Sequence, residues 1–142
     1  MQATSQSTKV LYTAKTRTTG ARENGVARSS DGRLDIQLST PGSDGQGTNP
    51  EQLFAAGWSA CFESALDGVA RKHGLRLPED TAIDAEVDLC SDKGEYFLQA
   101  RLHVDLPGME RMAAQQLVDA AHQTCPYSKA IQGNVNVEYY LV

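Results

Sequence analysis

Several features that would assign a chain of 142 residues to a common class are missing from this sequence. Basic residues are not in excess, because 13 Lys and Arg stand against 18 Asp and Glu, for a formal net charge of −5. This charge argues against nucleic acid as the main partner, since phosphate binding needs a basic face. No apolar run approaches the roughly 20 residues of a membrane span. The segment Met1–Thr8 is polar and has no apolar signal core, so we expect a cytoplasmic protein.

Cysteine is also scarce, with three in the chain and no Cys-x-x-Cys pair. Two of the three lie in contexts that suit reactive sulfur. Cys61 lies in an apolar segment, Glu51–Phe62, that has the character of a helix, and Cys125 stands before Pro126 at a predicted helix boundary. Two such thiols without a secretory signal indicate redox chemistry rather than a structural staple.

The length predicts one domain over residues 1–142, with residues 1–8 as a flexible N-terminus, and it suffices to bury a core without disulfides. Alternating apolar residues, turn signals and caps predict the elements in order. They are strands at 10–17, 26–30 and 34–38, an exposed loop at 39–48, a helix from the cap at Asn49 to His73, strands at 82–89 and 96–105, helices at 109–124 and 127–131, and a strand at 134–142. The order βββ-α-ββ-α-β predicts an α+β fold with antiparallel sheets around a central apolar helix.

Each thiol has a second interpretation. Cys61 also fits a small apolar core residue. Cys125 also fits a half-buried residue at a chain bend, although Pro126 at a first helical position would place the Cys125 sulfur at the positive end of a helix dipole, which favours thiolate. Cys90 ends an alternating strand with no flanking feature that would lower its pKa, so we interpret it as a bystander.

The residues alone leave other functions open. His122 and Cys125, three apart, would form a Cys2His zinc site with Cys61, although no paired metal-ligand motif supports one. A Cys–His hydrolase or acyltransferase would need a third group to orient His122. A non-enzymatic binder of small apolar ligands would not need the thiols. By themselves, Arg22 fits a solvated turn residue, and Glu51 fits a carboxylate that complements a helix N-terminus.

Two long motifs resemble one known family. Thr48–Phe62 (TNPEQLFAAGWSACF) is similar to the central helix of organic hydroperoxide resistance (Ohr) proteins, within the OsmC-like superfamily. Ala121–Val137 (AHQTCPYSKAIQGNVNV) resembles their second motif, and its Pro-Tyr-Ser favours the Ohr branch. Shorter matches extend the likeness to nearly the whole chain from Lys9 on; they are Leu11–Ala14, Thr19–Arg22, Ser29–Gly32 and Leu38–Pro41.

The resemblance implies a thiol peroxidase that reduces organic hydroperoxides to alcohols in oxidative stress defence. By position, Cys61 resembles the peroxidatic cysteine and Cys125 the resolving cysteine, while Arg22 and Glu51 resemble the pair that activates the thiolate. It implies no bound metal or flavin, reduction of the disulfide by dihydrolipoyl groups on lipoylated proteins, and an intertwined homodimer with its sites at the subunit interface.

The resemblance also directs attention to the surroundings of Cys61. The apolar bulk of Phe54, Trp58 and Phe62 is expected to form a substrate pocket suited to alkyl or fatty-acyl hydroperoxides. The chain departs from the family pattern at Cys90 and at the acids Glu63 and Asp67, where small or apolar residues are more usual. These acids bear on substrate preference and rate.

Helix geometry adds a prediction about the dimer. Glu51 and Cys61 are ten residues apart in one predicted helix, which separates them by about 15 Å along the axis and about 80° around it. Glu51 therefore does not easily serve Cys61 of its own chain. We expect each site to combine Cys61 and Cys125 of one chain with Arg22 and Glu51 of the other.

Overall fold

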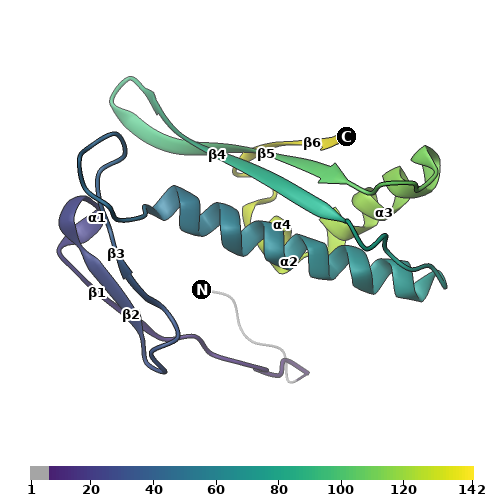
Figure 1. The fold of residues 1–142 in the computed structure, drawn as a ribbon, viewed down its shortest axis with the longest axis horizontal. Helices are drawn as coiled ribbons and strands as arrows, with labels where there is room; N and C mark the ends of the chain where they lie inside the picture. Colours follow the sequence, from purple (N-terminus) through teal and green to yellow (C-terminus); the bar gives the residue numbers. More distant parts are fainter. Residues whose placement is uncertain (1–6) are drawn as a thin grey trace. The chain divides into compact units, whose positions relative to one another are not determined.

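The computed structural model describes residues 7–142, which form two compact units that divide between Asn49 and Pro50. Each unit is described by itself. The elements follow the predicted order, with one extra turn of helix between the first two strands (Figure 1). The mixed α+β class is thus confirmed, while the single domain over residues 1–142 stays a prediction. Residues 1–6 of the predicted flexible N-terminus lie outside the described part.

The first unit is a small antiparallel sheet of order β1-β2-β3, made of β1 (Thr16–Thr19), β2 (Val26–Ser29) and β3 (Asp35–Gln37). The one-turn helix α1 (Ala21–Asn24) joins β1 to β2. The prediction of a strand from Val10 was too long, because β1 begins only at Thr16. Strand β2 ends at Ser29, which pairs with Thr16, so it offers no ladder partner to residues 10–15.

The second unit is built on α2 (Pro50–Lys72), which begins directly after Asn49, as predicted, and ends before Gly74, whose φ is 69°. The hairpin of β4 (Ala82–Asp92) and β5 (Glu95–Asp105) follows, closed by Lys93 and Gly94 at positive φ. Helices α3 (Arg111–Thr124) and α4 (Pro126–Ile131) then lead to β6 (Asn136–Leu141).

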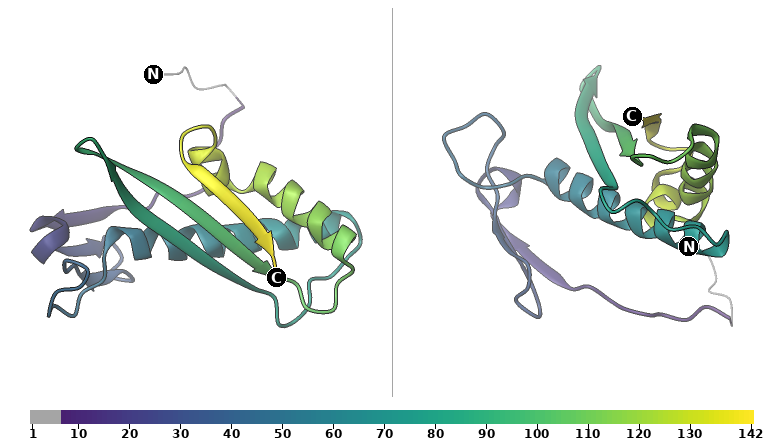
Figure 2. Two further views of the ribbon diagram at one scale, coloured as in Figure 1. Left: turned by 90° about the horizontal axis from the view of Figure 1, so that it is seen from above. Right: turned by 45° about the vertical axis from the view of Figure 1, so that its right-hand side comes forward.

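One strand pair differs from the predicted all-antiparallel sheets. Strands β4 and β5 are antiparallel, but β6 pairs with β5 in parallel. The reason is the connection, because α3 and α4 carry the chain back along the sheet before β6 begins, and a crossover of this kind joins parallel neighbours. Figure 2 shows β6 beside β5, with the helices on one side of this sheet.

The core of the second unit lies between its helices and one face of the β4-β5-β6 sheet. Helix α2 contributes Trp58, Phe62 and Leu66, all fully buried. Leu102 and Val104 of β5 and Ala121 of α3 are fully buried with them. The central position predicted for the apolar α2 is therefore confirmed within this unit. Burial of these apolar side chains is the main favourable contribution to its folding.

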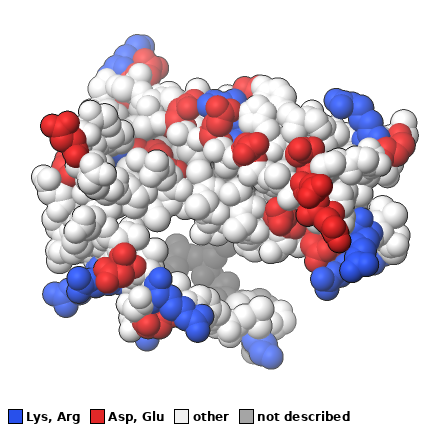
Figure 3. Space-filling model, in the orientation of Figure 1, with Lys and Arg blue, Asp and Glu red and all other residues white. Residues whose placement is uncertain are grey.

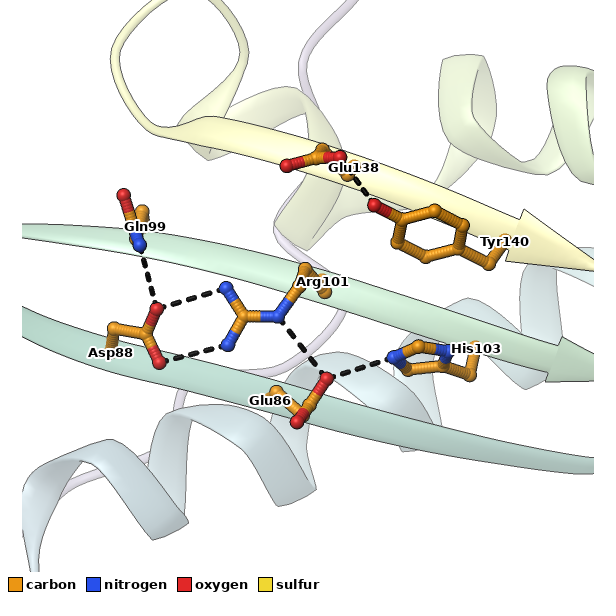
Figure 4. Close-up of polar contacts among 7 residues, drawn as sticks. All are labelled: Glu86, Asp88, Gln99, Arg101, His103, Glu138 and Tyr140. Carbon is orange, nitrogen blue, oxygen red and sulfur yellow. Dashed lines mark hydrogen bonds and ion pairs between the residues drawn. The ribbon is translucent and has the colours of Figure 1, made fainter.

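The opposite face of this sheet carries charged residues (Figure 4). Arg101 on β5 donates two hydrogen bonds of 2.9 Å to Asp88 on β4 and one of 3.1 Å to Glu86. Arg101 thereby lowers the pKa of Asp88 to about 2. His103 completes the row with a 2.8 Å contact to Glu86. Across residues 7–142, no helix is long and apolar enough to cross a membrane.

Candidate active site at two thiols

The two cysteines singled out by their sequence contexts are brought together, although 64 positions separate them. Cys61 lies in the middle of α2 and is half-buried, while Cys125 is fully buried. Their thiols are in hydrogen-bonding contact, and both are free rather than disulfide-bonded. Two reduced thiols in contact can be oxidised to a disulfide with little rearrangement.

Cys125 occupies the corner between α3 and α4. Its backbone N–H donates to Ala121 O at 2.8 Å, which closes α3, and its carbonyl accepts from Lys129 N at 2.9 Å, which opens α4. Pro126 takes the first position of α4, so the prediction of Cys125 as a helix N-cap is confirmed. Cys125 thus ends one helix and begins the next, and its thiol interacts with Cys61 on α2.

Burial is the main influence on the pKa of the Cys61 thiol. Burial raises the pKa of the Cys61 thiol, and contact with Cys125 raises it further, while the Tyr127 backbone N–H, which donates to the sulfur, lowers it. Because the thiolate is the reactive form, a nucleophilic role for Cys61 calls for a group that stabilises its negative charge.

Arg22, the predicted cation, is held in a distinctive turn of the first unit. Gly20 and Ala21 precede it with φ of 80° and 59°, and Ala21 is one of two residues other than glycine with positive φ in the described chain. A Cβ on Gly25 would lie 2.1 Å from Ala21 O, so the turn closes tightly around the half-buried Arg22. Non-glycine residues in this region of φ/ψ space cluster at functional sites.

Glu51 lies in the first turn of α2, on the same continuous helix as Cys61. The structure thus confirms the element on which the 15 Å separation depends. Because Arg22 and Glu51 belong to different units, the predicted pairing between them, and with Cys61, stays a prediction.

The three residues predicted to line a substrate pocket differ in their exposure to solvent. Trp58 and Phe62 are fully buried in the core, and only Phe54 is half-buried. Phe54 packs on Trp58 with ring centroids 5.9 Å apart and on Tyr127 at 6.2 Å. Phe54 and the exposed Tyr127 are therefore the aromatic groups here that a ligand approaching from solvent would meet.

Two polar residues beside Cys125 were not singled out from the sequence. Ser128 is fully buried and accepts a 3.2 Å hydrogen bond from the indole N–H of Trp58. The Tyr139 hydroxyl lies 3.5 Å from the Ser128 hydroxyl and makes a short hydrogen bond with His122 Nδ1. Ser128 belongs to the Pro-Tyr-Ser segment that follows Cys125, whereas no local pattern distinguishes Tyr139 from its neighbours on β6.

This contact decides the position of His122. Burial lowers the pKa of its imidazole, which favours the neutral ring. Its Nδ1 is engaged by Tyr139 rather than by sulfur. Within residues 7–142, no three His, Cys, Asp or Glu side chains are grouped as metal ligands. His122 Nδ1 thus contacts a tyrosine hydroxyl and not a cysteine sulfur.

The residues at which the chain departs from the family pattern lie away from the thiols. Glu63 follows Cys61 by about 200° around α2, and Asp67 pairs with Arg71 at 2.9 Å. Glu63 and Asp67 line an open cavity of about 340 Å³ beside Leu77 and Glu79, in the region where Figure 3 shows acidic side chains over the C-terminal half of α2. Cys90 pairs with Phe97 on the charged face of the sheet.

Gly57 provides a test of how closely Tyr127 packs against α2. A Cβ on Gly57 would lie 2.7 Å from the Tyr127 hydroxyl and 3.1 Å from its ring, whereas a Cβ on Gly68 of the same helix would meet nothing within 4 Å. We expect Gly57→Ala to push the exposed Tyr127 side chain away from α2 and to change the rate at which Cys61 reacts with electrophiles by about a few fold. Thiol-labelling rates and chemical denaturation would measure both effects.

Gly68→Ala is the matched control for this substitution. It is expected to gain up to about 1 kcal/mol of stability from helix propensity, whereas the displacement of the Tyr127 side chain opposes that gain at Gly57. Equal labelling rates in the two variants would contradict the proposed close packing of Tyr127 on α2.

The fold and the site together define an α+β protein in which a central helix and a helix corner present two thiols to each other. The OsmC-like protein family matches residues 42–140. An organic hydroperoxide resistance protein of Xanthomonas axonopodis pv. citri is 50% identical over 91% of this chain and 93% of its own length. OhrB of Bacillus subtilis is 43% identical over 92% of this chain and 98% of its own.

Solved structures agree with these relatives. The crystal structure of Bacillus subtilis OhrB matches with a TM-score of 0.88 at 42% identity, over 94% of this chain and all of that one. An organic hydroperoxide resistance protein from Legionella pneumophila matches with a TM-score of 0.86 at 42% identity, over 94% and 98%. The chain belongs to the OsmC-like family and, within it, to the organic hydroperoxide resistance proteins.

Proposed function

We propose that this protein is a thiol-dependent peroxidase that reduces organic hydroperoxides, of alkyl or fatty-acyl type, to alcohols. Cys61 is the peroxidatic and Cys125 the resolving cysteine. Dihydrolipoyl groups carried on a lipoylated protein restore the thiols. The names of the relatives support the substrate class, and the contact between the two thiols supports the chemistry.

The proposed reaction has three steps, two of them carried out by the cysteines and the third by an external dithiol. The Cys61 thiolate attacks one oxygen of the hydroperoxide, so that an S–O bond forms, the O–O bond breaks, and the alkoxide leaves as alcohol after taking a proton. Cys125 then attacks the sulfenic sulfur, which forms the disulfide and releases water. A dihydrolipoyl dithiol reduces this disulfide by exchange and is itself oxidised to the cyclic disulfide.

The observation that carries the proposal is the contact between the Cys61 and Cys125 thiols. A disulfide needs sulfurs about 2.05 Å apart, and Cys125 at the α3–α4 corner already interacts with Cys61 on α2. Cys125 is fully buried, so it is shielded from bulk oxidant until a sulfenic acid forms beside it.

The Cys61 thiolate needs a cation to stabilise it. In this proposal that cation is Arg22 held by Glu51, which would stabilise both the thiolate and the departing alkoxide. Because Glu51 is ten residues from Cys61 on α2, the Arg22–Glu51 pair is taken from the second chain of a homodimer. The proposal needs no bound metal or flavin.

The test is thiol titration after one equivalent of oxidant. Cumene hydroperoxide is expected to remove two thiols per chain and leave an intrachain Cys61–Cys125 disulfide, found by mass spectrometry of the unreduced digest. Hydrogen peroxide should react more slowly, because Phe54 and its aromatic neighbours favour an apolar substrate. Dihydrolipoamide should then restore the two thiols faster than thioredoxin or glutathione.

Three results would count against parts of this proposal. Unchanged thiols after cumene hydroperoxide would exclude the peroxidase activity. A disulfide formed equally fast with hydrogen peroxide would remove the preference for organic substrates. Reduction that is as fast with thioredoxin would remove the assignment of a dihydrolipoyl reductant.

A further inference from the structure

A chain of side-chain hydrogen bonds surrounds the buried Cys125. Ser128 follows Cys125 by three residues on α4, and His122 precedes it by three residues on α3. The Tyr139 hydroxyl, reaching in from β6, contacts both of them. It therefore bridges the two helices on either side of the corner that carries Cys125.

The same chain of contacts is tied to the helix that carries Cys61. Ser128 accepts the 3.2 Å hydrogen bond from Trp58, which lies three residues before Cys61 on α2. The ring of Tyr139 packs against Trp58 at 6.4 Å and is stacked on Phe62 at 5.7 Å. Trp58, Ser128 and Tyr139 thus connect α2, which carries Cys61, to the α3–α4 corner, which carries Cys125.

We infer that Tyr139 is a positioning residue for the resolving step, holding the α3–α4 corner so that the Cys125 thiol meets the sulfenic acid formed on Cys61. This inference depends on the proposed function, and it concerns the second half of the oxidation rather than the attack on peroxide. The attack takes place at the half-buried Cys61, and the Tyr139 hydroxyl makes its contacts on the Cys125 side.

The physical reason is the cost of a loosely held reactant. Misplacement by about 1 Å can cost on the order of a hundredfold in rate. Without the Tyr139 hydroxyl, Ser128 keeps its bond to Trp58, but the contacts that join α4 to His122 on α3 are lost. Cys125 then samples more positions, and a sulfenic acid that waits longer is exposed to a second molecule of peroxide.

The neighbouring residue offers a matched control. Tyr140 is next to Tyr139 on β6 but lies on the opposite face of the sheet, where its hydroxyl contacts Glu138 and its ring stacks on His103 (Figure 4). Tyr139→Phe and Tyr140→Phe each remove one hydroxyl and keep the ring. They differ in whether that hydroxyl belongs to the Cys125 corner.

The experiment is rapid mixing of the reduced full-length protein with cumene hydroperoxide, followed by acid quenching and mass spectrometry. Sulfenic acid, disulfide and sulfinic acid at Cys61 are counted over time. In Tyr139→Phe we expect the first oxidation to stay within about twofold of wild type and disulfide formation to slow about tenfold. Sulfinic acid should accumulate under excess peroxide. Tyr140→Phe should match wild type in both steps.

A second pair of variants serves if Tyr139→Phe does not fold. Ser128→Ala is expected to slow disulfide formation selectively, and Ser128→Thr, which keeps the hydroxyl, to restore much of it. Equal slowing of both steps in these variants, or a Tyr139→Phe protein that behaves like Tyr140→Phe, would overturn the inference. If the wild-type protein formed no disulfide, the proposed function itself would be wrong. If the wild-type protein formed its disulfide normally and Tyr139→Phe did so equally fast, only the role of Tyr139 would be wrong.

Discussion

Cys61→Ser is expected to abolish reduction of organic hydroperoxides, a loss of several orders of magnitude, because the serine hydroxyl is not ionised at neutral pH and the nucleophile disappears. Cys125→Ser should behave differently. It should consume one equivalent of peroxide and then stall, or gain further oxygen to reach sulfinic acid at Cys61, because no thiol is at hand to condense with the sulfenic acid. Mass spectrometry of the intact proteins after oxidation distinguishes the two variants.

The third cysteine supplies the control for these substitutions. Cys90 lies on the charged face of the β4-β5-β6 sheet, opposite Phe97, so Cys90→Ala should leave turnover within about twofold. If the Cys125→Ser protein gained no oxygen while Cys61→Ser did, the roles assigned to the two thiols would be reversed. If Cys90→Ala lost activity to the same degree as Cys61→Ser, the assignment of the reactive pair would fail.

Mixed dimers should show that each site takes residues from both chains. Cys61→Ser and Arg22→Ala homodimers are each expected to be inactive. A heterodimer of the two retains one site with Cys61 of one chain and an intact Arg22–Glu51 pair from the other, so about half of wild-type activity should return. The reason lies in α2, where ten residues of helix separate Glu51 from Cys61.

A heterodimer of Arg22→Ala with Glu51→Ala is the matched control. If one chain supplies both members of the pair, this combination leaves each site with a damaged pair, and activity should not return. Verified Cys61→Ser/Arg22→Ala heterodimers without activity, or a fully active monomer, would refute the shared site. Differently tagged subunits refolded together and purified in sequence would provide the material.

Local sequence signals predicted most of the secondary structure for identifiable reasons. The start of α2 follows from Asn49 and Pro50, and its end from Gly74, because each of these residues has a strong preference set by its own covalent geometry. The prediction of a strand from Val10 was wrong for residues 10–15, because a strand needs a hydrogen-bonded neighbour. Strand β2 pairs with β1 only from Thr16 on.

The candidate site was only partly visible in the sequence. Cys125 before Pro126 signalled a helix N-cap, which the α3–α4 corner confirms. Tyr139 gave no such signal, because its importance arises from contacts with His122 and Ser128, 17 and 11 residues earlier in the chain. The parallel pairing of β6 with β5 was missed for a related reason, since pairing direction follows from the path of the connecting helices.

By itself, the sequence determined the order of the elements and the membership of the family, and it singled out Cys61 and Cys125 as the candidate reactive pair, because these depend on residue types and their spacing along the chain. Only the tertiary structure decided that the two thiols touch, that their surroundings raise the pKa of Cys61, and that Tyr139 joins the helices on either side of Cys125. Such properties arise when residues far apart in the chain are packed together, because burial and contact change the free energy of a group without changing its neighbours in sequence.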